Sequence, residues 1–122
     1  MTKKDGSEKF PVLYITDANG GIGMAELIHW LHLGGDAQRF IIVGIGYPVD
    51  HALGGSNIRG RDLTPTHSAQ LEAEFGFPVD GVPSITSGKK SGGAKEFLSF
   101  IRDELVPFVD KNYNTIEGDR GY

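Results

Sequence analysis

The chain has 122 residues, of which 39% are hydrophobic, a length that allows at most one modest domain with its own core. Its formal net charge of −4 at pH 7 argues against nucleic acid or an anionic membrane as the main partner. It has no cysteine, which excludes disulfides and cysteine-based metal sites. It also lacks an apolar run long enough for a membrane span and a secretory signal, so we expect a cytoplasmic protein.

Apolar segments and a helical pattern alternate in the first half of the chain. Residues 11–16 (PVLYIT) are a β-branched and aromatic run without alternation, which is typical of a strand covered on both faces. The glycine-rich segment 17–23 predicts a loop, and the apolar spacing after it predicts a helix at about residues 22–33, ended by two glycines. Residues 40–46 (FIIVGIG) predict a second buried strand. This order predicts a parallel βαβ unit with adjacent strands.

The second half is less regular. Residues 48–92 are polar and rich in turn-forming residues, so we expect a long irregular region there, and a flexible N-terminus at residues 1–9. Apolar spacing then predicts a helix at about residues 93–111, with Ser91 as its N-cap and Pro107 causing a kink or break near its last turn. Its apolar stripe consists of Phe97, Leu98, Ile101, Leu105, Phe108 and Val109. The last nine residues, NTIEGDRGY, predict a polar loop.

Glu26, His29 and His32 are spaced three residues apart on the first predicted helix. Residues three apart share a helix face, so the two histidines could reach one metal ion with Glu26 nearby. A complete zinc site would need further ligands from Asp17, Asp50, His51, His67 or a second subunit. The alternative is that both histidines are solvated on an outer helix face.

Three stretches of the sequence together resemble one family. They are FPVLYITDANGGIGM, then FIIVGIGYP followed by RGRDLTPT, and then GGAKEFLSFIRDELVPFVDKNY. In type, order and spacing they resemble the putative-esterase family of the α/β-hydrolase fold, which includes siderophore esterases and relatives of esterase D. The resemblance implies an α/β fold class: residues 1–122 would form a single partial α/β-hydrolase domain with two adjacent parallel strands and two main helices.

The resemblance also implies where catalysis would take place. In the family, a strand and the Gly-x-Ser-x-Gly nucleophile elbow follow the segment that corresponds to the last residues here, and the Ser, acid and His of the triad come from there onward. No Gly-x-Ser-x-Gly sequence occurs in these 122 residues. The resemblance carries over one backbone donor of the oxyanion hole, from residues 17–20, which we assign to Asn19. A plain strand-to-helix turn is the alternative.

Arg59, Arg61 and Asp62 match an Arg-x-Arg-Asp stretch of the family. We expect a buried or half-buried ion pair that anchors the loop, and we keep an arginine clamp on an anionic substrate as the alternative.

Two further pairs of polar residues have simple interpretations. Ser56 and Ser68 are candidate nucleophiles only because they are serines, and we expect both in loops. Lys89 and Lys90 stand beside glycines without a Walker pattern, so a solvated loop is the better interpretation than a phosphate site.

Two functions from different classes are compatible with the sequence. The first is an esterase-like fragment that lacks the Ser-His-acid triad, needs no cofactor and has no serine-esterase activity of its own. The second is a zinc-dependent hydrolase of activated esters or phosphoesters, with a site formed on oligomerisation. Either would take a small-molecule ester or a related substrate, with neither nucleic acid nor membrane as a partner.

The expected sheet predicts self-association. Each predicted strand would lack a neighbour on one side, and such edges invite pairing with a second chain. A sheet of two strands is too small to cover the apolar residues of the second helix, which include Phe100. Trp30 fits a core or an interface. We therefore expect a homodimer or higher oligomer that completes the sheet, with an interface of one strand edge and apolar residues of the second helix.

Overall fold

The computed structural model describes residues 8–36, 38–47, 59–70 and 91–122. The chain divides into two compact units, one of residues Met1–Gly46 with Phe108–Tyr122 and one of residues Tyr47–Pro107. Most of the predicted irregular region 48–92, including Ser56, Lys89 and Lys90, lies outside the described residues. Within the described part of the chain, no helix is both long and apolar enough to cross a lipid bilayer.

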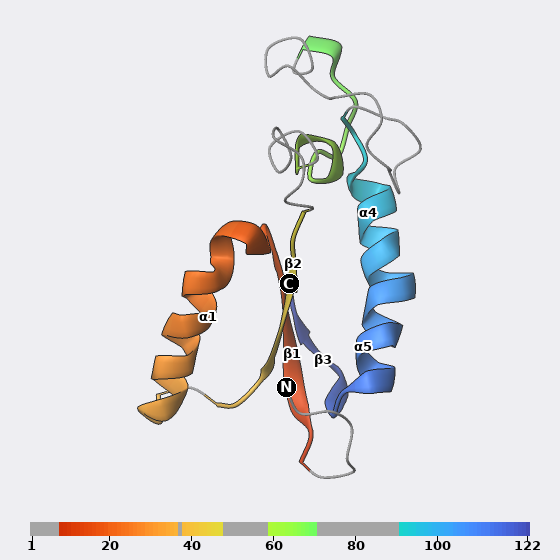
Figure 1. Cartoon of the computed structure of the whole chain (residues 1–122). Helices are drawn as coiled ribbons and strands as arrows, with labels where there is room; N and C mark the ends of the chain where they lie inside the picture. The colour runs from red at the N-terminus through yellow and green to blue at the C-terminus, as the bar shows by residue number, and fades with distance from the viewer. Residues whose placement is uncertain (1–7, 37, 48–58, 71–90) are drawn as a thin grey trace. The chain divides into compact units, whose positions relative to one another are not determined.

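The first unit is built on a three-stranded sheet (Figure 1). β1 (Phe10–Thr16) lies in the centre and pairs in parallel with β2 (Ile41–Ile45) on one side and with β3 (Thr115–Gly121) on the other. The predicted parallel pairing of PVLYIT with FIIVGIG is confirmed, with Val12 opposite Ile41. Because β1 is central, its side chains at Phe10, Val12 and Tyr14 are buried.

The third strand corrects the prediction that the last nine residues form a polar loop. β3 has the sequence TIEGDRG, and most of its side chains are exposed, as suits an edge strand that apolar patterning does not mark. Between the pairs Phe10–Thr115 and Val12–Arg120, two positions along β1 correspond to five along β3, so β3 bulges. Gly118 lies in this bulge with φ of +89°, a conformation open to glycine. β1 therefore has a neighbour on both sides.

α1 (Ala18–Leu33) connects β1 to β2 and begins four residues earlier than predicted, so the glycine-rich segment is mostly helix. Its predicted stop at two glycines is confirmed: Gly35 has φ of +81°, and the Asp36 N–H donates to the Leu31 carbonyl. α1 packs on β2, yet Leu27 and Leu31, two members of its expected apolar face, are 54% and 41% exposed.

A continuous helix follows in the second half of the chain: α4 (Ala94–Phe100), a π-helical turn η1 (Ile101–Leu105), and α5 (Val106–Asn112). Its extent confirms the prediction of 93–111. Ser91 is not its N-cap, because the helix begins after Gly93. Pro107 does not break the helix. The widened turn just before it, in which the Val106 N–H donates to the Ile101 carbonyl, accommodates a residue that has no N–H of its own.

The apolar stripe of this helix is only partly buried. Phe97, Ile101 and Val109 are buried as expected, and Val106 joins them. Leu98 and Phe108 are each 60% exposed, so this part of the apolar stripe is not covered by the rest of the chain.

Candidate functional site

The turn from β1 into α1 stands at the carboxyl edge of the parallel sheet, where open α/β sheets bind ligands. Asp17 closes β1 in the left-handed conformation, with φ of 58° and ψ of 32°, and is the only described non-glycine residue with positive φ. Such conformations cost energy in a non-glycine residue and are enriched at functional sites. The chain then enters α1 at once, and the Gly20 N–H donates to the Asp17 carbonyl at 3.0 Å.

Asn19 is the second residue of α1, so the prediction that it lies on a loop is wrong. Its N–H is outside the sheet ladder, because β1 ends at Thr16. It belongs to the first turn of a 16-residue helix, whose end carries partial positive charge. The position is suited to a developing oxyanion, and the catalytic role of Asn19 stays a prediction.

Two glycines at the end of β2 let the turn approach the sheet closely. A Cβ added at Gly44 would lie 2.8 Å from the Ala18 Cβ, and one added at Gly46 would lie 2.8 Å from the Asn19 Oδ1. A side chain at position 44 would therefore displace the first turn of α1, and one at position 46 would displace the Asn19 side chain. The alternating glycines of VGIG are a sequence signal for this approach, although the same residues also read as part of an apolar strand.

A polar cluster links the ends of β1 and β3. The Tyr14 and Tyr122 rings stack with centroids 5.5 Å apart, and Arg120 on β3 forms an ion pair with Asp110 on α5. Tyr14 is 3% exposed, and its Oη has no hydrogen-bond partner among the described residues. Burial raises the pKa of Tyr14; the Asp110 carboxylate also raises it, and Arg120 opposes them. Nothing in the sequence pattern marked this cluster.

The described residues do not bring together the ligands of the predicted zinc site, and two of its further candidates, Asp50 and His51, lie outside them. His29 and His32 line one cavity near the end of α1, but Glu26 does not line it. Among the described residues there is no group of three or more His, Cys, Asp or Glu side chains that could hold a metal ion. Two histidines one helical turn apart are too few ligands for a structural or catalytic zinc.

The predicted ion pair of the middle region is confirmed in the second unit. The Arg61 Nε donates to the Asp62 Oδ1 at 2.7 Å, and both side chains are buried. The neighbouring Thr64 Oγ1 donates to the Gly60 carbonyl and accepts from the Gly92 N–H at 2.7 Å. These contacts tie residues 59–64 to the segment before α4, which favours the anchoring role over a substrate clamp.

Ser91 also contacts Ser68 and the neighbouring His67. The Ser91 Oγ accepts the Ser68 N–H at 2.9 Å and lies 3.3 Å from the His67 Nδ1. Ser91 has no solvent exposure, so its hydroxyl cannot meet a substrate in this conformation. The serine–histidine contact therefore joins two segments and does not form a nucleophile with its base.

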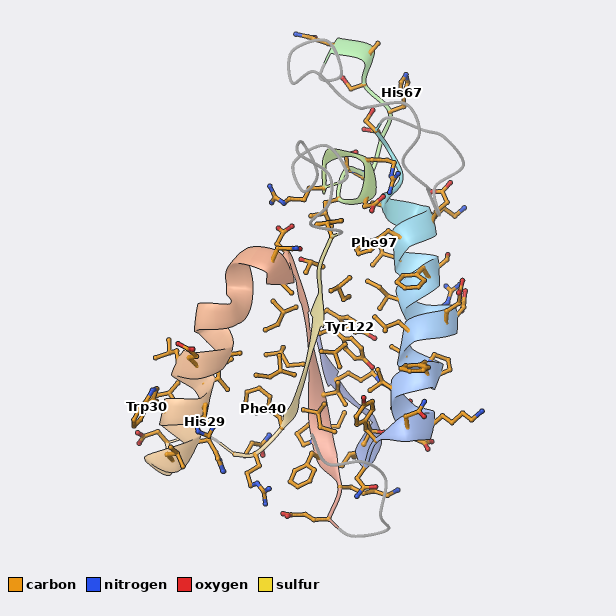
Figure 2. All side chains as sticks on the ribbon, in the orientation of Figure 1. His29, Trp30, Phe40, His67, Phe97 and Tyr122 are labelled. Atoms are coloured by element: carbon orange, nitrogen blue, oxygen red, sulfur yellow. The ribbon has the colours of Figure 1, made fainter. Side chains whose placement is uncertain are left out.

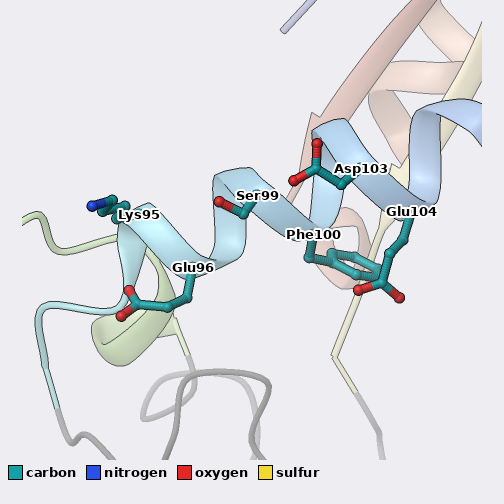
Figure 3. Close-up of a pocket in the computed structure, with 6 residues that line it drawn as sticks. All are labelled: Lys95, Glu96, Ser99, Phe100, Asp103 and Glu104. Atoms are coloured by element: carbon teal, nitrogen blue, oxygen red, sulfur yellow. The ribbon is translucent and has the colours of Figure 1, made fainter.

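A second hollow, of about 340 Å³, lies along α4 and η1 (Figure 3). It is lined by Lys95, Glu96, Ser99, Phe100, Asp103 and Glu104. Asp103 is already held by Arg102, whose guanidinium lowers the pKa of that carboxyl. This acidic groove has no feature that selects a ligand.

No family model matches the sequence. The chain is 31% identical over 109 residues to the ferri-bacillibactin esterase BesA of Bacillus subtilis, with 85% of this chain and 34% of the relative covered. It is 29% identical over 113 residues to the siderophore triacetylfusarinine C esterase of Aspergillus fumigatus, with 91% and 33% covered. The chain is thus similar in sequence to these two siderophore esterases. It spans about a third of the length of these curated relatives.

Solved structures agree with this relationship. The BES protein from Bacillus cereus matches with a TM-score of 0.66 at 25% identity, covering 98% of this chain and 41% of that one. An IroE-like serine hydrolase from Shewanella oneidensis matches with a TM-score of 0.57 at 29% identity, covering 88% and 30%. These likenesses confirm the resemblance and the partial α/β-hydrolase core predicted from the sequence.

Proposed function

We propose that this chain forms part of an esterase-type hydrolase site and contributes the Asn19 N–H as a donor to the oxyanion of a small-molecule ester. The observation that carries the proposal is the position of Asn19. Asn19 lies in the first helical turn after β1, at the carboxyl edge of the parallel sheet. The fold around it is similar to that of a serine hydrolase of known structure. In ester hydrolysis the carbonyl oxygen gains negative charge, and a fixed N–H at a helix N-terminus stabilises that charge.

We further propose that these 122 residues do not hydrolyse esters through a serine by themselves. A serine nucleophile needs a base within hydrogen-bonding reach and access to substrate. Within the described residues, the contact of Ser91 with His67 fails on access, because Ser91 is fully buried. The sequence offers no Gly-x-Ser-x-Gly elbow within these residues.

The test combines an activity assay with a covalent probe. The purified chain is incubated with p-nitrophenyl acetate and, separately, with a fluorophosphonate that labels activated serines, followed by intact-mass measurement. We expect hydrolysis at the buffer rate and no mass increase. A fluorophosphonate adduct on any serine would contradict the proposal.

A chelator arm addresses the zinc alternative. The same assay, with an added phosphotriester substrate, is run with EDTA and then with excess Zn²⁺. We expect neither addition to change the rate, because no described cluster provides three ligands. Hydrolysis that EDTA abolishes and Zn²⁺ restores would replace our proposal with the metal-dependent one.

A further inference from the structure

The first unit holds a cavity of about 250 Å³ between the last turns of α1 and the start of β2. Asn19 lies at the other end of α1, which at 16 residues is roughly 24 Å long by the rise of an α-helix. The cavity is therefore separate from the proposed oxyanion turn. A ligand could bind in it whether or not Asn19 serves as an oxyanion donor.

Each polar side chain that lines this cavity can donate a hydrogen bond. His29 and His32 come from α1, and Gln38 and Arg39 come from the segment that enters β2. None of the side chains that line the cavity is acidic. Two imidazoles, an amide and a guanidinium around one hollow suit an anion with oxygen acceptors.

Arg39 is held in place while keeping donors available. Its Nη1 contacts the Glu8 Oε2 at 3.1 Å, and its guanidinium lies 4.8 Å from the centre of the Phe10 ring. A guanidinium has five N–H donors, and one contact with Glu8 occupies one of them. The Glu8 side chain is 65% exposed, so water screens its competition for the positive charge. The Arg39 side chain is 54% exposed and keeps N–H groups that can donate to a second carboxylate.

The rest of the lining is apolar. Ile28 from α1 and Phe40 and Ile42 from the β2 side contribute carbon surface, and all three are half-buried. Figure 2 shows His29 and Phe40 near the lower part of α1, while Trp30 points away from β2 on the outer side of the helix. The volume lies just below the roughly 300–1,000 Å³ of sites for drug-sized ligands, which suits a smaller molecule.

We propose that this cavity binds a small organic acid with an aromatic or branched apolar body. The carboxylate lies at the rim, where Arg39 and the two histidines donate to it. The apolar body covers Ile28 and Phe40 and removes their surface from water. Charge-assisted hydrogen bonds fix the orientation, and the apolar contact selects against acids without a body.

Benzoate is the probe for this site, and ¹⁵N–¹H NMR of the full chain locates its binding. We expect saturable shifts at the amides of His29, His32, Gln38 and Arg39, and none at Asn19. Benzamide, which has the same body without the charge, and acetate, which has the charge without the body, should each bind at least about tenfold more weakly.

Two variants complete the test. His29→Ala combined with His32→Ala should weaken benzoate binding by about tenfold or more, since it removes two hydrogen-bond donors. Glu26→Gln changes a residue of the same helix that does not line the cavity, and should leave binding unchanged. Benzamide binding as well as benzoate, or benzoate shifts that map outside the cavity, would overturn the proposal. Zn²⁺ binding at His29 and His32 without any benzoate binding would also overturn it.

Discussion

Tyr14 lies on the central strand with its hydroxyl removed from water and without a hydrogen-bond partner among the described residues. A buried hydroxyl without a partner contributes little to stability, because it loses its hydrogen bonds to water when the chain folds. Its raised pKa comes first from burial and then from the Asp110 carboxylate. The buried pair of Arg61 and Asp62 differs, since each charge there compensates the other. Tyr14 and the Arg61–Asp62 pair therefore lead to opposite expectations for mutation.

Tyr14→Phe should leave the free energy of unfolding at pH 7 within about 1 kcal/mol of the wild type. At high pH the two proteins should diverge. The folded pKa of Tyr14 is raised above 10.0, so the unfolded chain releases this proton first and the wild type loses stability as pH rises from 10.0 through the raised pKa. The variant lacks this loss. Urea unfolding at pH 7 and at roughly pH 11 measures the free energy of unfolding of both proteins. An equal loss of stability at high pH in both proteins would contradict the assignment of this loss to Tyr14.

Asp62→Ala should be strongly destabilising. It leaves the Arg61 guanidinium, 6% exposed as a residue, without its bidentate partner, at a cost of about 3–5 kcal/mol. Asp103→Ala is the matched control, because Arg102 and Asp103 form the same kind of neighbouring pair at 2.6 Å on an exposed helix face. The control should show no measurable loss in a urea titration. Equal effects of the two substitutions would mean that burial does not determine the outcome.

At the scale of elements, the apolar patterns predicted β1, β2 and both helices, because burial imposes those patterns. They did not predict β3, whose glycines and charges suit an exposed edge strand held by main-chain pairing and by the contact of Arg120 with Asp110. Helical periodicity does not distinguish buried from exposed apolar positions, since Leu98 and Phe108 fit the spacing but are exposed.

For the candidate site, too, the sequence predicted some features, and others could be seen only in the structure. The family resemblance pointed to Asn19. Only the structure shows that Asp17 has a left-handed backbone conformation and that the Asn19 side chain approaches Gly46. These features depend on backbone conformation and on residues distant in sequence, so no local pattern carries them.

The close packing of α1 on β2 can be tested with two glycine substitutions. Gly44→Ala places a methyl group 2.8 Å from the Ala18 Cβ and should cost about 1–3 kcal/mol, because backbone must move. Gly23→Ala lies in α1 with open space around its Cβ and should stabilise by about 0.5–1 kcal/mol through helix propensity. Thermal unfolding compares them. Stabilisation by both would show that the turn is not packed against β2.

At the scale of the whole molecule, we propose that the chain self-associates. The expectation of a free second edge on β1 was wrong, since β3 occupies that edge. In the described sheet order, however, β2 and β3 are edge strands. Large apolar side chains also remain exposed on the C-terminal helix, with Leu98 and Phe108 each at 60%. An edge strand and exposed large apolar side chains each favour pairing with a second copy.

Sedimentation velocity at micromolar concentration tests this proposal. We expect a species of at least twice 13.2 kDa. Phe108→Ser should shift the distribution toward monomer, and Lys111→Ser, an exposed change on the same helix, should leave it unchanged. A folded monomer at all concentrations would rule out self-association.

The central claim concerns the Asn19 N–H as a donor to an oxyanion, and NMR observes that group directly. The ¹⁵N-labelled chain is titrated with diethyl phosphate, a singly charged tetrahedral anion that mimics the intermediate of ester hydrolysis. We predict a saturable downfield shift of the Asn19 amide proton, while the amide of Glu117 on β3, which lies in neither proposed site, remains unchanged. An Asn19 amide that does not respond, or that responds no more than Glu117, would contradict this assignment.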